Sequence, residues 1–515
     1  MEELKKEDAV ENRKAKIKTW FSSWIKDSHN KIFLGIFVLA IIIRIYFLIN
    51  TLHQPVWWDA ADYLTGAKVL GNGLDIGYVF NPRRAFLMPL LWAGLIKLGL
   101  GEVSFRILEF LFSIAAVPAL YFLGSKMFNK KVGLISSFLI SVFWMHIFYS
   151  NRLMTEIPTL TFLIIASYFF WQAYAFNKEK NYIWWGIFLG LAFLARAGTL
   201  VMFAVFPIFL VITQRFKIFK KKYLWLGVLC TLVLMASFFV FTSFYLHKNA
   251  IPYFLALTPE TGEAGGTRFS NIMGLPGIWE YVNAMPHYFG LILMITFYGS
   301  LVIFLLDFIL GLDLIVRRKE TSLDSYLFLF IFALIPFIFQ SVFYNHFEDR
   351  YLMNAFPAFF LIMGLGLTKL SPILKNIHKF APIIVIVAIL GFGAYHQLTY
   401  GNPIIDGRKS SYLEVKQAGL WIKDNSLPGD IIISRSQPQM TYYAERKTLH
   451  PPDNETEFEE LIEKEKPTFF MVSVFEPHQD WMYQYPASHN STLIPVKAYS
   501  QGNQPVAVIY RFNYT

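Results

Sequence analysis

The chain has little cysteine and little charge, and both shortages limit what it can be. Its 515 residues include one cysteine, Cys230, so neither a disulfide framework nor a cysteine metal site can form within one chain. Charged residues make up 16% of the chain and hydrophobic residues 55%, whereas soluble proteins carry roughly a quarter charged residues. Charge is scarce between residues 32 and 398 and abundant outside that stretch, which predicts a membrane core with two polar ends.

The net charge of +10 does not indicate nucleic-acid binding. The lysines and arginines fall mostly in short loops between apolar segments, where they act as topology signals. The N-terminal stretch is charged and the first apolar segment is long enough to span, so we expect no cleavable signal peptide.

Apolar segments of about 20 residues can cross a bilayer as helices. The sequence predicts an α-helical polytopic membrane protein of about eleven spans. The two short segments on either side of Arg196 could instead form one broken hairpin. The predicted spans are residues 32–49, 103–123, 132–148, 157–176, 182–194, 200–212, 224–245, 288–310, 326–344, 352–367 and 382–394.

Basic and non-basic loops alternate along the chain, which predicts its orientation in the membrane. Cytoplasmic loops carry an excess of lysine and arginine. This rule places residues 1–31 in the cytoplasm, the loops 51–102 and 247–287 outside, and a C-terminal domain, residues 399–515, outside. We expect a multi-pass protein of the plasma membrane.

Two regions outside the spans have patterns of their own. Residues 63–70 and 86–98 are amphipathic but too short or broken to span, so we expect them to lie in the membrane interface. The tail alternates between strand and helix patterns, which predicts a small α/β domain. Its predicted helices are residues 411–425 and 455–465, and its predicted strands are residues 430–434, 467–475, 493–498 and 505–512.

Asp59, Asp62 and Tyr63 follow the first span, beside Trp57 and Trp58. In a helix, residues three and four apart share a face. A partly desolvated carboxylate there could act as a general base. An aromatic belt with Asp59 as a helix cap is the alternative interpretation.

Two further loops contain ionisable residues that topology does not explain. The loop at residues 151–158 contains Glu156, which either caps the following helix or takes part in a site. Arg350 lies in a loop predicted to be outside, where basic residues are not expected, and a guanidinium there suits a phosphate. A local ion pair with a neighbouring carboxylate is the alternative. The other candidate binding residues of this loop are His346, Glu348 and Tyr351.

The remaining charges in the predicted outer loops are scattered. Arg83, Arg84, Arg196, Arg268 and His287 are either functional or reach out to the membrane interface. We interpret Arg106 and Glu109, near the start of the second span, as a structural ion pair.

The order of these motifs resembles the GT-C superfamily of membrane glycosyltransferases, which use polyprenyl-phosphate-linked sugars. The chain is similar to the branch of protein mannosyltransferases and aminoarabinose transferases. The resemblance depends on four features in a fixed order. They are Asp59 with Tyr63, an apolar helix at residues 81–98 after a proline turn, Arg152 with Glu156 and Pro158, and Arg350-Tyr351-Leu352 followed by Pro357.

The resemblance implies an inverting sugar transfer on the outer face of the membrane. It implies catalytic roles for Asp59, Glu156 and Asp62, with Asp59 as the base. It implies donor-phosphate binding by Arg350, Arg268, Arg196, His346 and Arg84, and substrate binding by Tyr63, Tyr351 and Glu348.

The expected partners are a polyprenyl-phosphate sugar, a protein, lipid or glycan acceptor, and the bilayer. We expect no cofactor and no essential metal. The rival functions are a transporter or lipid flippase and a non-catalytic scaffold.

Overall fold

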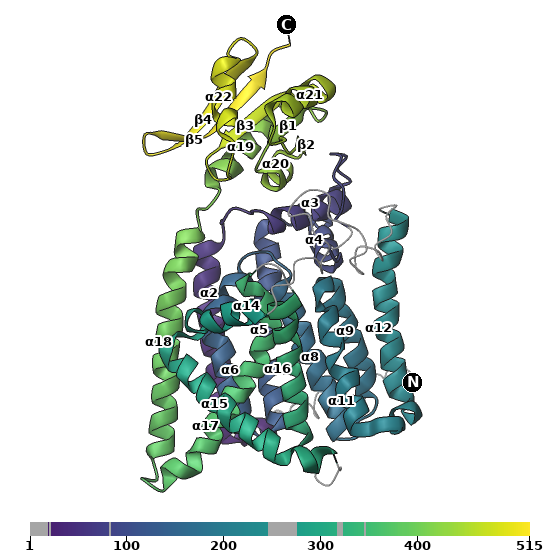
Figure 1. Ribbon diagram of the computed structural model, residues 1–515, viewed down its shortest axis with the longest axis vertical. Helices are drawn as coiled ribbons and strands as arrows, with labels where there is room; N and C mark the ends of the chain where they lie inside the picture. Colours follow the sequence, from purple (N-terminus) through teal and green to yellow (C-terminus); the bar gives the residue numbers. More distant parts are fainter. Residues whose placement is uncertain are drawn as a thin grey trace, which may run out of the picture.

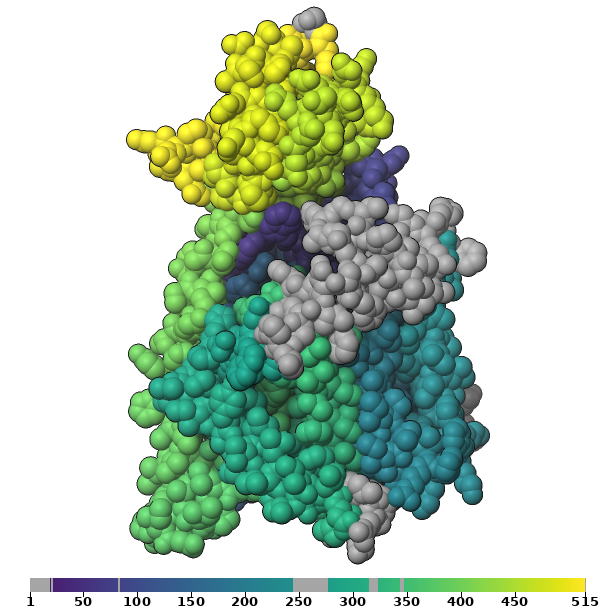
Figure 2. All heavy atoms as spheres, in the orientation of Figure 1, coloured from purple at the N-terminus to yellow at the C-terminus, as the bar shows by residue number. Residues whose placement is uncertain are grey.

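The structure, a computed structural model, describes residues 19, 22–81, 84–245, 275–316, 323–343 and 347–514. A bundle of long helices carries a small α/β domain at one end, formed by the C-terminal part of the chain (Figure 1). Figure 2 shows this domain, in yellow, directly above residues from the early part of the chain, in purple.

In the described part of the chain, nine helices are long and apolar enough to cross a membrane, and a bent pair raises the number to ten. The chain is therefore a multi-pass membrane protein. The nine helices include α2 (Ser28–Thr51), α5 (Glu102–Met127), α8 (Glu156–Ala175), α10 with α11 (Leu200–Phe203 and Val205–Gln214), α12 (Lys222–Val240), α15 (Met285–Val316), α16 (Asp324–Phe343), α17 (Phe356–Lys375) and α18 (Ala381–Arg408).

Several of the eleven predicted spans differ from a straight helix of full length. Residues 288–310 include a kink at Gly290 of α15, and residues 200–212 are divided between α10 and α11. Residues 132–148 form the bent pair α6 (Lys130–Val142) and α7 (Trp144–Ser150), which meet at 56°. Residues 182–194 form α9 (Asn181–Ala195), which has 15 residues and is shorter than the other spans. Helix α9 packs closely against α12, because two glycines allow their backbones to touch, and Thr231 donates a hydrogen bond of 2.9 Å to the carbonyl of Gly186.

Arg44 of α2 holds the bend between α6 and α7. Its side chain is 1% exposed and makes five hydrogen bonds. The acceptors are the Ser113 hydroxyl at 2.7 Å, the carbonyls of Ala40, Ser141 and Ile140, and the His146 ring at 2.9 Å. The guanidinium therefore binds backbone carbonyls where the bend frees them from the helical pattern.

Two short helices lie at the end of the bundle that carries the α/β domain (Figure 1). They are α3 (Asp59–Asn72) and α4 (Leu87–Lys97), and they coincide with the predicted amphipathic stretches. Most of the predicted outer loop 247–287 lies outside the described residues. Its described part forms α14 (Leu275–Asn283) and the start of α15.

The C-terminal domain contains a mixed sheet of five strands in the order β2-β1-β3-β5-β4. Strands β2, β1 and β3 are parallel, and β5 and β4 are antiparallel to their neighbours. The sequence predicted four of the strands and two of the helices, but missed α20, β2 and α22. The elements are α19 (Leu413–Asp424), β1 (Ile431–Ser434), α20 (Gln437–Ala444), β2 (Lys447–Leu449), α21 (Glu455–Glu465), β3 (Phe469–Ser473), α22 (Asp480–Ser488), β4 (Leu493–Gln501) and β5 (Gln504–Phe512).

Helix α20 fixes the domain to α3. Tyr443 accepts a hydrogen bond of 2.5 Å from the backbone N–H of Val56, and Lys68 donates bonds to the Tyr442 carbonyl at 2.8 Å and to Glu445 at 2.9 Å. The predicted domain boundary at residue 399 falls inside α18, which continues to Arg408. The last helix of the bundle therefore leads directly into the small domain.

Candidate active site

Helix α3 begins at Asp59, and its first turn brings three predicted residues to one face. Asp59 accepts a hydrogen bond of 2.6 Å from Arg84 Nη2, and Asp62 forms an ion pair of 3.0 Å with Arg84 Nε. The Arg84 guanidinium also lies 4.7 Å from the centre of the Tyr63 ring. Carboxylates in the first turn of a helix are stabilised by its dipole.

The backbone is strained immediately before Asp59. Trp58 has a φ of 49°, which side chains other than glycine rarely adopt. Its indole N–H donates a hydrogen bond of 2.8 Å to the Tyr412 hydroxyl of the C-terminal domain. Strain of this kind persists where surrounding contacts hold it, and it is concentrated at functional sites.

Arg350 reaches Asp59 from the other side. It lies in η4 (Asp349–Ala355), the 3-10 turn before α17. Its Nη1 atom donates to Asp59 Oδ2 at 2.8 Å and lies 3.6 Å from Glu156 Oε1. Its Nε atom donates to Glu348. One guanidinium thus contacts three carboxylates from three separate segments.

Glu156 and Arg196 complete the arrangement. Glu156 begins α8, and Arg196 follows α9 at the break before η1 (Ala197–Thr199). Arg196 donates a hydrogen bond to Glu156 Oε1, and Glu156 is 2% exposed. We call Asp59, Asp62, Arg84, Glu156, Arg196, Glu348 and Arg350 the carboxylate–arginine cluster.

Charges within the cluster shift its titration. Burial alone would raise the pKa of Asp59, but Arg84 and Arg350 outweigh burial and hold that pKa well below its usual range. Burial would lower the pKa of Arg84, yet Asp62 and other nearby groups raise it above its usual value. Burial also raises the pKa of Tyr63. Asp59 is therefore ionised at neutral pH and Tyr63 is protonated.

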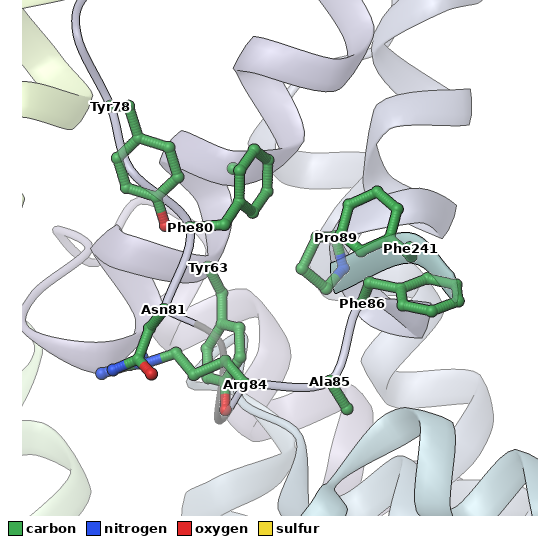
Figure 3. Close-up of a pocket in the computed structure, with 10 residues that line it drawn as sticks. Tyr63, Tyr78, Phe80, Asn81, Arg84, Ala85, Phe86, Pro89 and Phe241 are labelled. Carbon is green, nitrogen blue, oxygen red and sulfur yellow. The ribbon is translucent and has the colours of Figure 1, made fainter. Parts of the chain in front are cut away.

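Two pockets adjoin the carboxylate–arginine cluster. The first, which we call the aromatic pocket, is lined in part by Arg84. Figure 3 shows the Tyr63 ring next to Arg84, with Phe86, Pro89 and Phe241 grouped together further along the pocket. Phe241 follows α12, so this pocket joins the α3–α4 region to a spanning helix.

The second, which we call the polar pocket, lies between α8, η1, α16 and η4. It contains four residues of the predicted site. Its lining is Glu156, Thr159, Arg196, Gly198, Gln340, Arg350, Tyr351, Met353 and Asn354.

The structure brings together nine of the predicted site residues, and two lie outside the described residues. Those two are Arg268 and His346. The nine are Asp59, Asp62, Tyr63, Arg84, Glu156, Arg196, Glu348, Arg350 and Tyr351. The roles assigned to all eleven stay predictions.

One predicted contact is wrong. Arg106 does not pair with Glu109. Its two terminal nitrogens donate hydrogen bonds to the backbone carbonyls of Asn151 and Gln54, each at 2.5 Å. Glu109 is fully buried, and neither of its carboxylate oxygens has a hydrogen-bond partner among the described residues. The backbone turns that surround Arg106 offer better acceptors than a side chain on its own helix.

Sequence reasoning missed several polar residues near the site. Thr159, Gln340 and Asn354 line the polar pocket, and Tyr78 donates a hydrogen bond of 2.9 Å to Asp62. Thr159 and Gln340 are polar residues inside apolar spans, which is the signal that could have found them. In the described part of the chain, no three His, Cys, Asp or Glu side chains are grouped to hold a metal ion.

The sequence analysis also singled out His287, and its side chain lies in a separate group of contacts. Its ring nitrogens contact the Tyr400 hydroxyl at 2.5 Å and Asp349 at 3.2 Å. Asp349 is adjacent to Arg350, so this group flanks the carboxylate–arginine cluster without joining it.

Comparisons with known proteins show which families and folds this chain is similar to. The family model of dolichyl-phosphate-mannose-protein mannosyltransferase matches residues 83–241. A search of curated proteins found no match. Residues 83–241 include Arg84, Glu156 and Arg196 of the cluster and Phe241 of the aromatic pocket.

Solved structures show the same fold over most of the chain. ArnT from Cupriavidus metallidurans, bound to undecaprenyl phosphate, is 12% identical with a TM-score of 0.63, and the match covers 92% of this chain and 97% of that one. The oligosaccharyltransferase AglB from Archaeoglobus fulgidus, in complex with an inhibitory peptide and a dolichol-phosphate, is 13% identical with a TM-score of 0.57 and coverages of 95% and 75%.

The mycobacterial arabinofuranosyltransferase AftD is 10% identical with a TM-score of 0.59, over 93% of this chain and 40% of that one. Together with the family match, these structures confirm the resemblance seen in the sequence: the chain has the fold of the GT-C superfamily of membrane glycosyltransferases.

Proposed function

We propose that the protein transfers a sugar from a polyprenyl-phosphate donor, such as a dolichyl or undecaprenyl phosphate sugar, to an acceptor outside the membrane. The observation that carries this proposal is the position of Asp59. Its two carboxylate oxygens are held by two arginines, Arg84 at 2.6 Å and Arg350 at 2.8 Å, at the end of a membrane bundle. A base therefore lies between two cations that suit a phosphate.

The donor phosphate competes with Asp59 for the arginines. Guanidinium groups bind phosphate oxygens through paired, charge-assisted hydrogen bonds. We expect a bound phosphate to take N–H groups of Arg84 and Arg350 that now bind Asp59. Asp59 then loses the contacts that lower its pKa and becomes a better proton acceptor. Donor binding would thus prepare the base.

The transfer itself is a single inverting displacement. The acceptor hydroxyl gives its proton to Asp59 while its oxygen forms a bond to the anomeric carbon of the sugar. The bond between that carbon and the phosphate oxygen breaks, and the electron pair leaves with the polyprenyl phosphate. Arg350 and Arg84 stabilise the negative charge as it develops on the leaving group.

The other cluster residues support these two roles. Glu156 holds Arg196 and lies 3.6 Å from Arg350, so it fixes the position of the phosphate-binding guanidinium. Glu348 holds the same guanidinium at Nε, and Asp62 with Tyr63 holds Arg84. The aromatic pocket beside Arg84 suits the first units of the prenyl chain, because its lining is mainly apolar and aromatic.

The comparisons support a lipid-linked donor. ArnT binds undecaprenyl phosphate and AglB binds a dolichol-phosphate with similar folds. The comparisons give a transporter or flippase no support. By the positive-inside rule we place the protein in the plasma membrane, with its N-terminus in the cytoplasm and the cluster and C-terminal domain outside.

The test is a donor screen with purified protein in liposomes. Dolichyl and undecaprenyl phosphate sugars are offered with peptide, lipid and glycan acceptors, and release of polyprenyl phosphate is measured. We expect release with at least one donor, a fall of about 10²–10⁴-fold in Asp59→Asn, and no loss when EDTA removes divalent metals.

Asp75→Asn is the matched control, because Asp75 is exposed in the segment that follows α3. Equal turnover by Asp59→Asn and Asp75→Asn would remove Asp59 from the mechanism. Absence of release with every donor would refute the proposed function.

A further inference from the structure

The polar pocket contains three polar atoms that have no hydrogen-bond partner among the described residues. They are Glu156 Oε2, Thr159 Oγ1 and Gln340 Oε1. The residues that carry them are 2%, 1% and 8% exposed. They come from two separate helices, α8 and α16, so the pocket is assembled by the packing of the bundle.

Unpartnered atoms of this kind are costly. Buried polar groups in proteins nearly always have a hydrogen-bond partner, and each exception calls for an explanation. These three atoms come from three different residues that line one pocket. A ligand that donates hydrogen bonds would satisfy all three at once.

The chemistry of the lining indicates what that ligand is. A carboxylate oxygen and an amide oxygen accept hydrogen bonds, and a threonine hydroxyl can accept or donate. A sugar presents several hydroxyl donors at fixed spacing. The two guanidiniums of Arg196 and Arg350 also line the pocket, against the single carboxylate of Glu156. An ammonium group would meet like charges there, so the lining favours a neutral sugar.

The position of the pocket fits the same ligand. It shares Arg350, Arg196 and Glu156 with the carboxylate–arginine cluster, and Arg350 Nη1 contacts Asp59 at 2.8 Å. A phosphate bound by Arg350 would therefore leave the attached sugar beside the pocket. The aromatic pocket beside Arg84 remains for the prenyl chain.

We propose that the polar pocket binds the sugar ring of the donor and selects a neutral sugar through its hydroxyl groups, with Gln340 and Thr159 as specificity-determining residues. This inference rests on the proposed transferase function. It adds the class of sugar and two residues that do not belong to the carboxylate–arginine cluster.

The experiment separates sugar binding from phosphate binding. Gln340→Leu removes the amide and keeps an apolar side chain of similar size. With a neutral hexosyl donor, we expect its KM for the donor to rise by about tenfold or more, since one buried hydrogen bond is lost. Inhibition by polyprenyl phosphate without a sugar should stay at the wild-type level, because that ligand does not enter the pocket.

Two further variants control for folding. Gln172→Leu makes the same change at another buried glutamine, in α8 outside the pocket, and should leave the KM unchanged. Thr159→Val changes the shape of its site very little and should raise the KM in the same selective way. If Gln340→Leu does not fold, Thr159→Val tests the inference.

The outcomes distinguish this inference from the proposed function. The inference alone would be overturned if the wild-type protein transfers the sugar but the two variants do not separate the ligands. In that case Gln340→Leu and Thr159→Val would change neither the KM for the donor nor the inhibition by polyprenyl phosphate, or would change both equally. A wild-type preference for an amino-sugar donor over its hydroxyl counterpart would also overturn it. Failure of the wild-type protein to use any donor would instead refute the function on which it rests.

Discussion

Two arginines in this protein, Arg44 and Arg350, have very different surroundings. Arg44 lies at the bend between α6 and α7 and makes five hydrogen bonds, to three backbone carbonyls, a serine and a histidine. Arg350 lies at the end of the bundle and contacts three carboxylates, those of Asp59, Glu156 and Glu348. Arg44 has neutral partners and Arg350 has charged ones.

The two arginines differ in whether the polar groups around them remain available to bind a ligand. A guanidinium has five N–H donors, and Arg44 has five hydrogen bonds, so its site is closed. Around Arg350, Glu156 keeps an oxygen without a hydrogen-bond partner among the described residues, and two pockets adjoin the cluster. Burial of a charge in a membrane protein is therefore a weak sign of function by itself. A buried charge beside a pocket with unused polar groups is a stronger sign.

The first prediction concerns Arg350 of the carboxylate–arginine cluster. Arg350→Ala should lower kcat/KM for the donor by about 10²–10³-fold, because the leaving phosphate loses a preorganised charge. Arg350→Lys should recover part of this loss, since lysine keeps the charge but not the forked geometry. Turnover with a polyprenyl-phosphate sugar, at varied donor and acceptor concentrations, measures both effects.

Arg435→Ala is the control, because Arg435 forms an ion pair with exposed Asp453 in the C-terminal domain. An Arg350→Ala variant with unchanged dependence on donor concentration would assign the phosphate contact to other residues. In that case Arg350 would no longer differ from Arg44 in having a role in donor binding.

The second prediction concerns Arg44. Arg44→Met should lower the free energy of unfolding by about 3 kcal/mol, because the carbonyls of Ser141 and Ile140 lose their donors inside the bundle. Thermal unfolding in detergent measures the loss. The turnover of the protein that remains folded should match the wild type. A variant of normal stability with impaired turnover would show that Arg44, too, serves the reaction.

The third prediction follows from the pKa of Asp59. That pKa is held down by Arg84 and Arg350, and the base must be ionised to act. In Arg84→Ala one of the two cations is gone, so the pKa of Asp59 rises and the acid limb of kcat/KM moves to higher pH by about one unit or more. A limb that stays at the wild-type pH would exclude Asp59 as the group that titrates.

Much of the fold can be predicted from the sequence, because helix length and loop charge are local properties. All eleven apolar segments contain helices, and the amphipathic stretches became α3 and α4. The elements missed in the C-terminal domain are short. Strand β2 has three residues, too few for an alternating pattern, and α20 has only eight.

Most residues of the candidate cluster could be predicted from the sequence, but the contacts between them could not. Asp59, Glu156 and Arg350 stand out because each is charged at the edge of a span. Their meeting depends on how α3, α8 and η4 pack, which no local pattern encodes. The Arg106–Glu109 pair failed for the same reason. Arg106 turns to carbonyls contributed by segments 45 and 52 residues away in sequence.

The last prediction concerns a carboxylate held by two lysines where α20 meets α3. Glu445 pairs with Lys68 of α3 at 2.9 Å and with Lys423 at 2.8 Å. Burial would raise the pKa of Glu445, but the two lysines outweigh burial and lower it. The paired side chains are partly exposed, so Glu445→Gln should cost about 0.5–1 kcal/mol of stability at neutral pH.

The stability from Glu445 is present above the pKa of the unfolded chain, near 4.5, and disappears as the pH falls through the lower folded value. The thermal midpoints of wild type and Glu445→Gln should therefore converge in acid, with turnover at neutral pH unaffected. Glu465→Gln, which alters a carboxylate–lysine pair within the C-terminal domain, is the control. Loss of turnover in Glu445→Gln alone would mean that the contact between α20 and α3 positions Asp59, and that an ion-paired carboxylate outside the cluster can also serve the reaction.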